Sequence, residues 1–237
     1  MLDTATPIVV LHEDDDLVAV SKPAGLPVVP AASGPSDACL HRRLEVERGE
    51  RLFVVHRLDR DASGVVVFAR TASAHRAFCL AFEQRVVHKT YTAYVVGTLP
   101  GDKGHIDIPL HTARRGKTRP ALPAEPRRRE AATDFEVERR WTVRGHVVSR
   151  VRVHPHTGRH HQIRVHLRAV GAPLLFDRHY GAATTAAGFA AAPCQRLALH
   201  ARELQLPRPT GVTLVLDAPL AADLAALEAW LESVADA

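Results

Sequence analysis

A carboxylate stands between guanidinium groups in the segment VVHRLDRDASGVVVFAR, which covers residues 54–70. Asp59 lies between Arg57 and Arg60, and a Ser-Gly step and a β-branched run follow it. Charged side chains gathered in this way can belong to a functional site. The alternative is a solvated ion pair at the start of a strand, which contributes little to stability. The segment alone leaves both interpretations open.

A run of histidines invites comparison with metal sites. These histidines are His154, His156, His160, His161 and His166. The spacing HxxxH would place His156 and His160 on one helical face, but no HExxH or CxxC pattern accompanies them. Arg159 and Arg164 lie between these histidines and would repel a cation. We therefore predict no metal site, and expect helix caps and phosphate contacts as the roles of these side chains.

Composition and missing motifs exclude several function classes. The chain has 237 residues, 46% of them hydrophobic, and a net charge of +5, which favours an anionic partner. It contains no GxxxxGK[ST], GxGxxG or GxSxG motif, so nucleotide-triphosphate, dinucleotide and serine-hydrolase mechanisms lack sequence support. No segment approaches the roughly 20 apolar residues of a membrane span, and the three cysteines lack disulfide or metal spacing. We expect a soluble cytoplasmic protein.

Short apolar runs predict the elements that position these groups. Strands are expected at residues 8–11, 17–21, 65–69, 91–96, 106–108, 134–138, 147–153, 197–200 and 212–216. Helices are expected at 73–83, at 221–234, and from a cap at Thr157 to a stop at Gly171. Many strands with few helices and no regular alternation predict an α+β fold with a mixed, mostly antiparallel sheet and flanking helices.

A basic segment interrupts this pattern between residues 111 and 130. Within it, RRGKTRPALPAEPRRR carries seven Lys and Arg residues, three prolines and the single acid Glu125. The prolines predict a mobile loop, and this charge density suits phosphate contacts that release counterions. A solvated surface without a nucleic-acid partner is the alternative.

Four segments together resemble a known family. They are KPAGLPVVP from Lys22, HRLDRDASG from His56, KTYTAYVVG from Lys89 and HPHTGRHHQIRVHLRAVGAPLLFDRHYG from His154. In this order and spacing they resemble the RluA-type family of RNA pseudouridine synthases, over residues 8–216. The resemblance implies one catalytic domain over residues 1–237, without the S4-like RNA-binding domain of many relatives. It also implies a cofactor-free, monomeric enzyme that acts on structured ribosomal or transfer RNA and has no membrane partner.

The resemblance also implies roles for individual residues. Asp59 is expected to attack the target uridine, Tyr91 to stack near its base, and Arg164 to form a salt bridge with Asp59. The expected substrate-binding residues are His56, Arg57, Arg159, Gln162 and Ile163.

The sequence departs from the family pattern in three places. Ala62 stands where the family usually has Thr, His160 where it usually has Thr or Ser, and Phe176 where Gly is common. None of these changes removes a catalytic group. A catalytically silent RNA-binding protein of the same fold is the alternative function. A glycoside hydrolase would need a second carboxyl group opposite Asp59.

Overall fold

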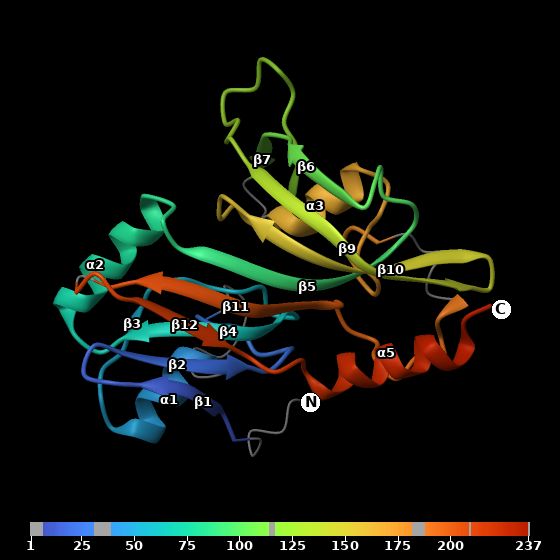
Figure 1. The fold of residues 1–237 in the computed structure, drawn as a ribbon. Helices are drawn as coiled ribbons and strands as arrows, with labels where there is room; N and C mark the ends of the chain where they lie inside the picture. The colour runs from blue at the N-terminus through green and yellow to red at the C-terminus, as the bar shows by residue number, and fades with distance from the viewer. Residues whose placement is uncertain (1–6, 31–38, 114–116, 182–187, 209, 237) are drawn as a thin grey trace. The chain divides into compact units, whose positions relative to one another are not determined.

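The computed structural model describes residues 7–30, 39–113, 117–181, 188–208 and 210–236 (Figure 1). The chain forms two compact units. Unit 1 consists of residues 1–89 and 200–221, and unit 2 consists of residues 90–199 and 222–237. No helix in the described ranges has both the length and the apolar composition needed to cross a membrane.

Unit 1 contains a mixed sheet in which most strand pairs are antiparallel. Its strands are β1 (Val9–Glu13), β2 (Leu17–Lys22), β3 (Phe53–Val54), β4 (Ser63–Ala69), β11 (Leu199–Pro207) and β12 (Thr213–Asp217). The order is β1-β2-β4-β11, β3 also pairs with β4, and β12 pairs with β11. Only the pairing of β4 with β11 is parallel among these. The strands predicted at residues 8–11 and 17–21 pair as an antiparallel hairpin, and the predicted α+β class is confirmed.

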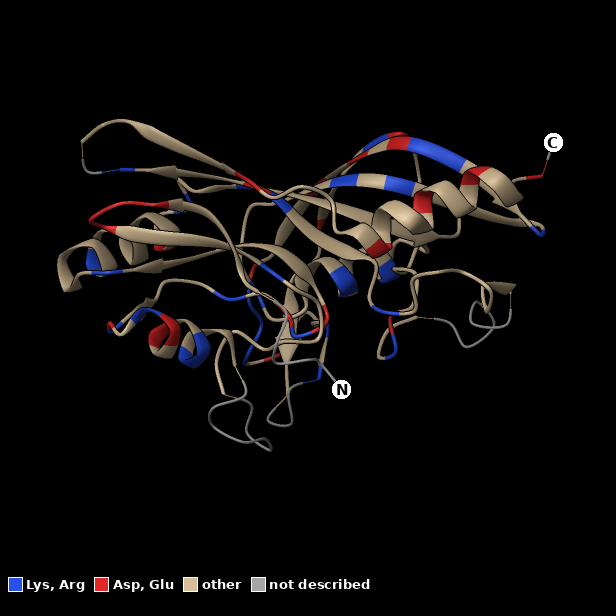
Figure 2. Ribbon diagram, turned by 90° about the horizontal axis from the view of Figure 1, so that it is seen from below, with Lys and Arg blue, Asp and Glu red and all other residues tan. Residues whose placement is uncertain are grey.

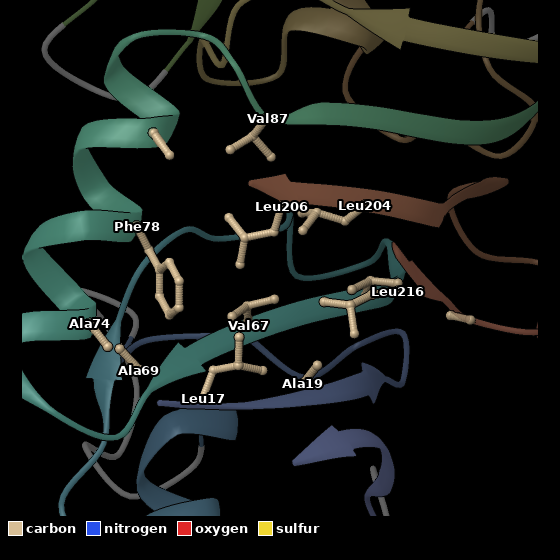
Figure 3. Close-up of a cluster of buried hydrophobic side chains, with 13 residues drawn as sticks. Leu17, Ala19, Val67, Ala69, Ala74, Phe78, Val87, Leu204, Leu206 and Leu216 are labelled. Carbon is tan, nitrogen blue, oxygen red and sulfur yellow. The ribbon is translucent and has the colours of Figure 1, made fainter. Parts of the chain in front are cut away.

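Two helices cover opposite faces of this sheet. The helix α2 (Ala72–Glu83) begins after Thr71, whose Oγ1 accepts a hydrogen bond from the Ala74 N–H at 3.1 Å. Its Phe78 packs against Val67 and the β11 side chains, as Figure 3 shows. The helix α1 (Leu40–Arg48) lies on the other face, where His41 stacks on Phe68. The strand β4 is therefore buried on both faces, which explains its uninterrupted apolar run.

Unit 2 is built on an antiparallel sheet with the order β5-β10-β9-β6. These strands are β5 (His88–Val96), whose first residues belong to unit 1, β10 (His146–Pro155), β9 (Ala132–Val143) and β6 (Lys103–Asp107). The helix α5 (Ala222–Val234) buries Leu224, Leu227 and Leu231, as its period predicts. Glu228 of this helix accepts hydrogen bonds from Tyr94 and Arg150 on the sheet. Figure 2 shows the acidic residues of α5 beside basic residues of the neighbouring strands.

The helix α3 (Gln162–Ala169) begins later than predicted. His161, with a φ of 53°, is its N-cap residue, and Thr157 does not cap it. Instead the Thr157 hydroxyl donates to Gln162 Oε1 at 2.6 Å, which holds residues 156–161 in a turn. His156 and His160 therefore do not share a helical face. The predicted stop is close, because the helix ends just before Gly171.

The basic segment contains regular structure, contrary to the prediction. The strands β7 (Leu110–Thr112) and β8 (Thr118–Pro120) form a hairpin, while residues 114–116 lie outside the described residues. Leu110 and Arg129 exchange two backbone hydrogen bonds, of 2.8 and 2.9 Å. The carboxylate of Glu125 accepts from Arg119 and from the Leu122 N–H. This single acid therefore organises the chain between the hairpin and Arg129.

Candidate active site

The loop that carries Asp59 is fixed by a buried lysine. Lys22 is 1% exposed, and its Nζ donates to the carbonyl oxygens of Pro23, Leu26 and Arg60 at 2.8 to 2.9 Å. The Arg60 carbonyl also accepts from the Gly25 N–H at 2.8 Å, and Arg60 Nε donates to the Gly25 carbonyl at 3.0 Å. The KPAGLP loop thus holds the residue next to Asp59. Sequence reasoning assigned Lys22 no role, although its position between an apolar strand and a proline is a usable signal.

Ser63 and Gly64, which follow Asp59, let β4 pack closely against β11. Ser63 Oγ lies 2.9 Å from His200 Nδ1, and His200 Nε2 lies 3.1 Å from the Ala218 carbonyl. The second contact places the imidazole proton on Nε2, so Nδ1 accepts from the serine. Gly64 has a φ of 116°, and a Cβ there would lie 2.1 Å from the Ala201 carbonyl oxygen. Only glycine permits this approach.

His56 has structural contacts inside unit 1. Its Nε2 accepts a hydrogen bond from the Val67 N–H at 3.0 Å, and its ring stacks on Phe82 at 4.8 Å. Burial, and then the charge of Lys89, lower the pKa of His56 to about 3, so the ring is neutral at pH 7. Burial also lowers the pKa of Lys89 to about 8. A substrate contact by His56 stays a prediction, as it does for the neighbouring Arg57, which is exposed.

Arg164 is held in unit 2 by a buried carboxylate. Its Nε and one terminal nitrogen each donate to Asp177 at 2.8 Å. Asp177 Oδ1 also accepts from the N–H groups of His179 and Tyr180. Burial alone would raise the pKa of Asp177, but the hydrogen bonds and charge of Arg164 hold it below the usual value. The guanidinium lies 5.0 Å from the centre of the Tyr180 ring, so its plane is fixed from two sides.

Asp177 and Tyr180 belong to the segment PLLFDRHYG, but sequence reasoning assigned them no role. Phe176 in the same segment has a φ of 59°, a left-handed conformation that explains why the family often has glycine there. His161 Nδ1 lies 3.0 Å from the Tyr180 hydroxyl, and His160 Nδ1 lies 2.9 Å from Thr118 Oγ1. His160 therefore joins the start of α3 to the basic segment, and His161 joins it to Tyr180.

Gln162 uses both ends of its amide within unit 2. Its Oε1 accepts from Thr157 and from the Arg159 N–H, while its Nε2 donates to the Ala132 carbonyl and to Thr133 Oγ1. These contacts favour a positioning role over direct substrate binding. Arg159 Nε donates to the Glu130 carbonyl at 3.1 Å.

The remaining predicted residues lie on regular elements. Tyr91 is partly buried on β5, opposite Val153 of β10, and Ile163 is buried on α3. Asp59 belongs to unit 1, whereas Tyr91 and Arg164 belong to unit 2.

Comparison with known proteins identifies the family. A family model described as RNA pseudouridylate synthase matches residues 16–169. RluA of Vibrio vulnificus, a dual-specificity RNA pseudouridine synthase, is 36% identical over 201 residues, covering 84% of this chain and 78% of that protein. Ribosomal large subunit pseudouridine synthase D of Pseudomonas aeruginosa is 34% identical, with coverages of 95% and 71%. tRNA pseudouridine synthase C of Pasteurella multocida is 35% identical, with coverages of 84% and 86%.

Coverage of other relatives is smaller, and the fold agrees with a solved structure. The chain spans 56% of the length of an uncharacterized RNA pseudouridine synthase from Aquifex aeolicus, at 36% identity. The structure of human RNA pseudouridylate synthase domain containing 4 matches with a TM-score of 0.74 at 26% identity, covering 94% of this chain and 93% of that chain. The chain belongs to the RluA-type family of RNA pseudouridine synthases, whose members are isomerases.

Proposed function

We propose that this chain converts uridine to pseudouridine in structured RNA with Asp59 as the nucleophile. The observation that carries the proposal is the fixed loop of Asp59. The neighbouring residue, Arg60, accepts hydrogen bonds from Lys22 and Gly25 through its backbone carbonyl. This loop lies in the part of the chain that the family model matches. A nucleophile held in one position loses little entropy on reaching the reacting carbon.

The proposed reaction moves uracil from a nitrogen link to a carbon link. A base inside a stem first leaves its stack, and Asp59 then attacks the uridine during detachment of uracil from the sugar. The ring of Tyr91 stacks on the base while it turns, and uracil is rejoined through C5 as the bond between Asp59 and the substrate breaks. The Tyr91 phenol then helps remove the C5 proton, which restores aromaticity.

Arg164 supplies a fixed positive charge in this proposal. Asp177 binds two of its nitrogens and Tyr180 lies against its plane, so the guanidinium has one orientation. We propose that this oriented cation forms a salt bridge with Asp59. Asp177 and Tyr180 then act as positioning residues for the catalytic arginine.

We further propose ribosomal or transfer RNA as the substrate. Two relatives described above carry names that specify the ribosomal large subunit and tRNA. Arg127, Arg128 and Arg129 are exposed in the basic segment and suit phosphate contacts. The proposal includes a cytoplasmic monomer that needs no cofactor.

Release of tritium from RNA labelled at uridine C5 tests this function. The purified chain should release tritium from a ribosomal or transfer RNA transcript. Mapping pseudouridine in cells with and without the gene then identifies the site. If the purified chain binds such RNA but no pseudouridine forms, the silent RNA-binding protein is the correct description.

A further inference from the structure

Two histidines that are distant in the sequence meet at one carboxylate of unit 2. His105 on β6 lies opposite Asp134 on β9, and His156 follows β10. Asp134 Oδ1 lies 2.5 Å from His105 Nδ1, and Asp134 Oδ2 lies 2.6 Å from His156 Nε2. The two imidazole centres are 5.9 Å apart. The histidine pattern did not reveal this cluster, because Asp134 lies 22 residues from His156 and 29 residues from His105 along the chain.

The geometry points to a binding site for a divalent transition-metal ion. One ligand atom from each of the three side chains lies within 4.8 Å of the others. Around a tetrahedral Zn²⁺ with bonds of about 2.0 to 2.1 Å, ligand atoms lie about 3.4 Å apart. Side-chain shifts of about an ångström therefore convert the hydrogen-bonded cluster into a coordination shell. We propose that His105, Asp134 and His156 bind Zn²⁺ or a similar ion, with water completing the shell.

The cations nearest to this cluster are engaged by another carboxylate. Asp134 and Glu136 point to the same face of β9, because residues two apart on a strand share a face. The nearby cations Lys103 and Arg152 are both paired with Glu136. His154 is the cross-strand partner of Asp134 on β10 and adds a third imidazole to this face.

The position of the site indicates a structural task. A metal ion there would tie β6 and β9 to His156, whose N–H also bonds to the Ala132 carbonyl at 3.0 Å. His156 begins the turn at residues 156–161, which leads into α3. A ligand that binds only the folded chain raises its stability, so bound metal should raise the melting temperature. The inference does not depend on the proposed nucleophile.

Zinc titration in competition with a chromogenic chelator tests the site. The full chain, stripped of metal, should bind one Zn²⁺, and added Zn²⁺ should raise its melting temperature. His105→Gln, Asp134→Asn and His156→Gln should each weaken binding at least tenfold and abolish the thermal shift. Melting curves in chelator establish that each variant folds.

Two control variants separate this site from general histidine binding. His12→Gln removes a similar contact in unit 1, where His12 Nε2 lies 2.7 Å from Asp14, and should leave zinc affinity unchanged. His179→Gln alters a histidine near the stacked rings of His160 and His161, and should also have no effect. The inference is overturned if wild type shows no saturable binding of one ion, if the three cluster variants bind as wild type does, or if His179→Gln abolishes binding.

Discussion

Two arginines of unit 2 each bind a carboxylate through two nitrogens, but in different surroundings. Arg164 and Asp177 have side chains that are 7% and 0% exposed, whereas those of Arg119 and Glu125 are 50% and 13% exposed. Water screens an exposed pair, which typically contributes 0 to about 1 kcal/mol. Removing one partner of a buried pair typically costs about 3 to 5 kcal/mol. A pair with two hydrogen bonds therefore fixes a proposed catalytic group in one region and orders a surface segment in the other.

The largest effect is expected from Asp177→Asn. The amide cannot balance the buried charge of Arg164, so the free energy of unfolding should fall by about 3 to 5 kcal/mol. Turnover should fall as well, because the orientation of Arg164 is lost. Urea unfolding and tritium release measure the two effects.

Asp223→Asn is the matched control for this comparison. Asp223 accepts the same fork from Arg196, with two distances of 2.7 Å, but is 39% exposed. Its substitution should cost clearly less stability and should spare turnover. Equal losses in the two variants would show that burial does not distinguish the two pairs.

Tyr91→Phe should slow the reaction by about a hundredfold or more, the usual scale for losing a general acid or base. The ring still stacks, so RNA binding and the attack by Asp59 should remain. A base-modified intermediate should then accumulate in single-turnover experiments. Wild-type turnover would mean that the hydroxyl has no catalytic task, and failure to fold or bind RNA would assign Tyr91 to the core.

His56 is a partly buried group whose effect on stability depends on pH. Its pKa is about 3 in the folded chain and about 6.5 in an unfolded one. Between these values the unfolded state binds a proton that the folded state does not, so stability falls as pH falls through this window. Wild type should therefore lose more stability than His56→Gln between pH 7 and pH 4. Urea unfolding at each pH measures this difference. If both proteins lose the same stability between pH 7 and pH 4, His56 does not cause the pH dependence.

The smallest effect on stability is expected from exposed arginines of the basic segment that contains Arg119. Replacing Arg127, Arg128 and Arg129 by Ala should change the free energy of unfolding by no more than about 0.5 kcal/mol. The slope of log affinity for RNA against log salt should become shallower by about 0.7 to 0.9 for each phosphate that the variant no longer neutralises. Arg42→Ala, on α1, is a control that should keep the slope. An unchanged slope in the triple variant would leave the basic segment a solvated surface.

Local pattern was sufficient to predict the elements with strong periodicity. The helix α5 has three leucines at helical spacing, and the strand β4 is a continuous apolar run. The helix α1 was missed because only Leu40 and Leu44 are buried among its charged residues. The start of α3 was misplaced because Gln162 binds the Thr157 hydroxyl that would have capped it.

The supports of the proposed site could not be predicted, because they depend on contacts between distant parts of the chain. Lys22 reaches the carbonyl of Arg60, 38 residues away, and Ser63 meets His200, 137 residues away. The family motifs predicted roles for Asp59, Tyr91 and Arg164, but not the groups that orient them. The role of Asp177 depends on the fold, which brings the PLLFDRHYG segment against α3.

Tritium release by Asp59→Asn tests the proposed mechanism most directly. The amide keeps the shape of the side chain but cannot act as a nucleophile, so turnover should be abolished. Affinity for RNA and the unfolding curve should stay close to those of wild type. Turnover near the wild-type rate would contradict the assignment of Asp59 as the nucleophile.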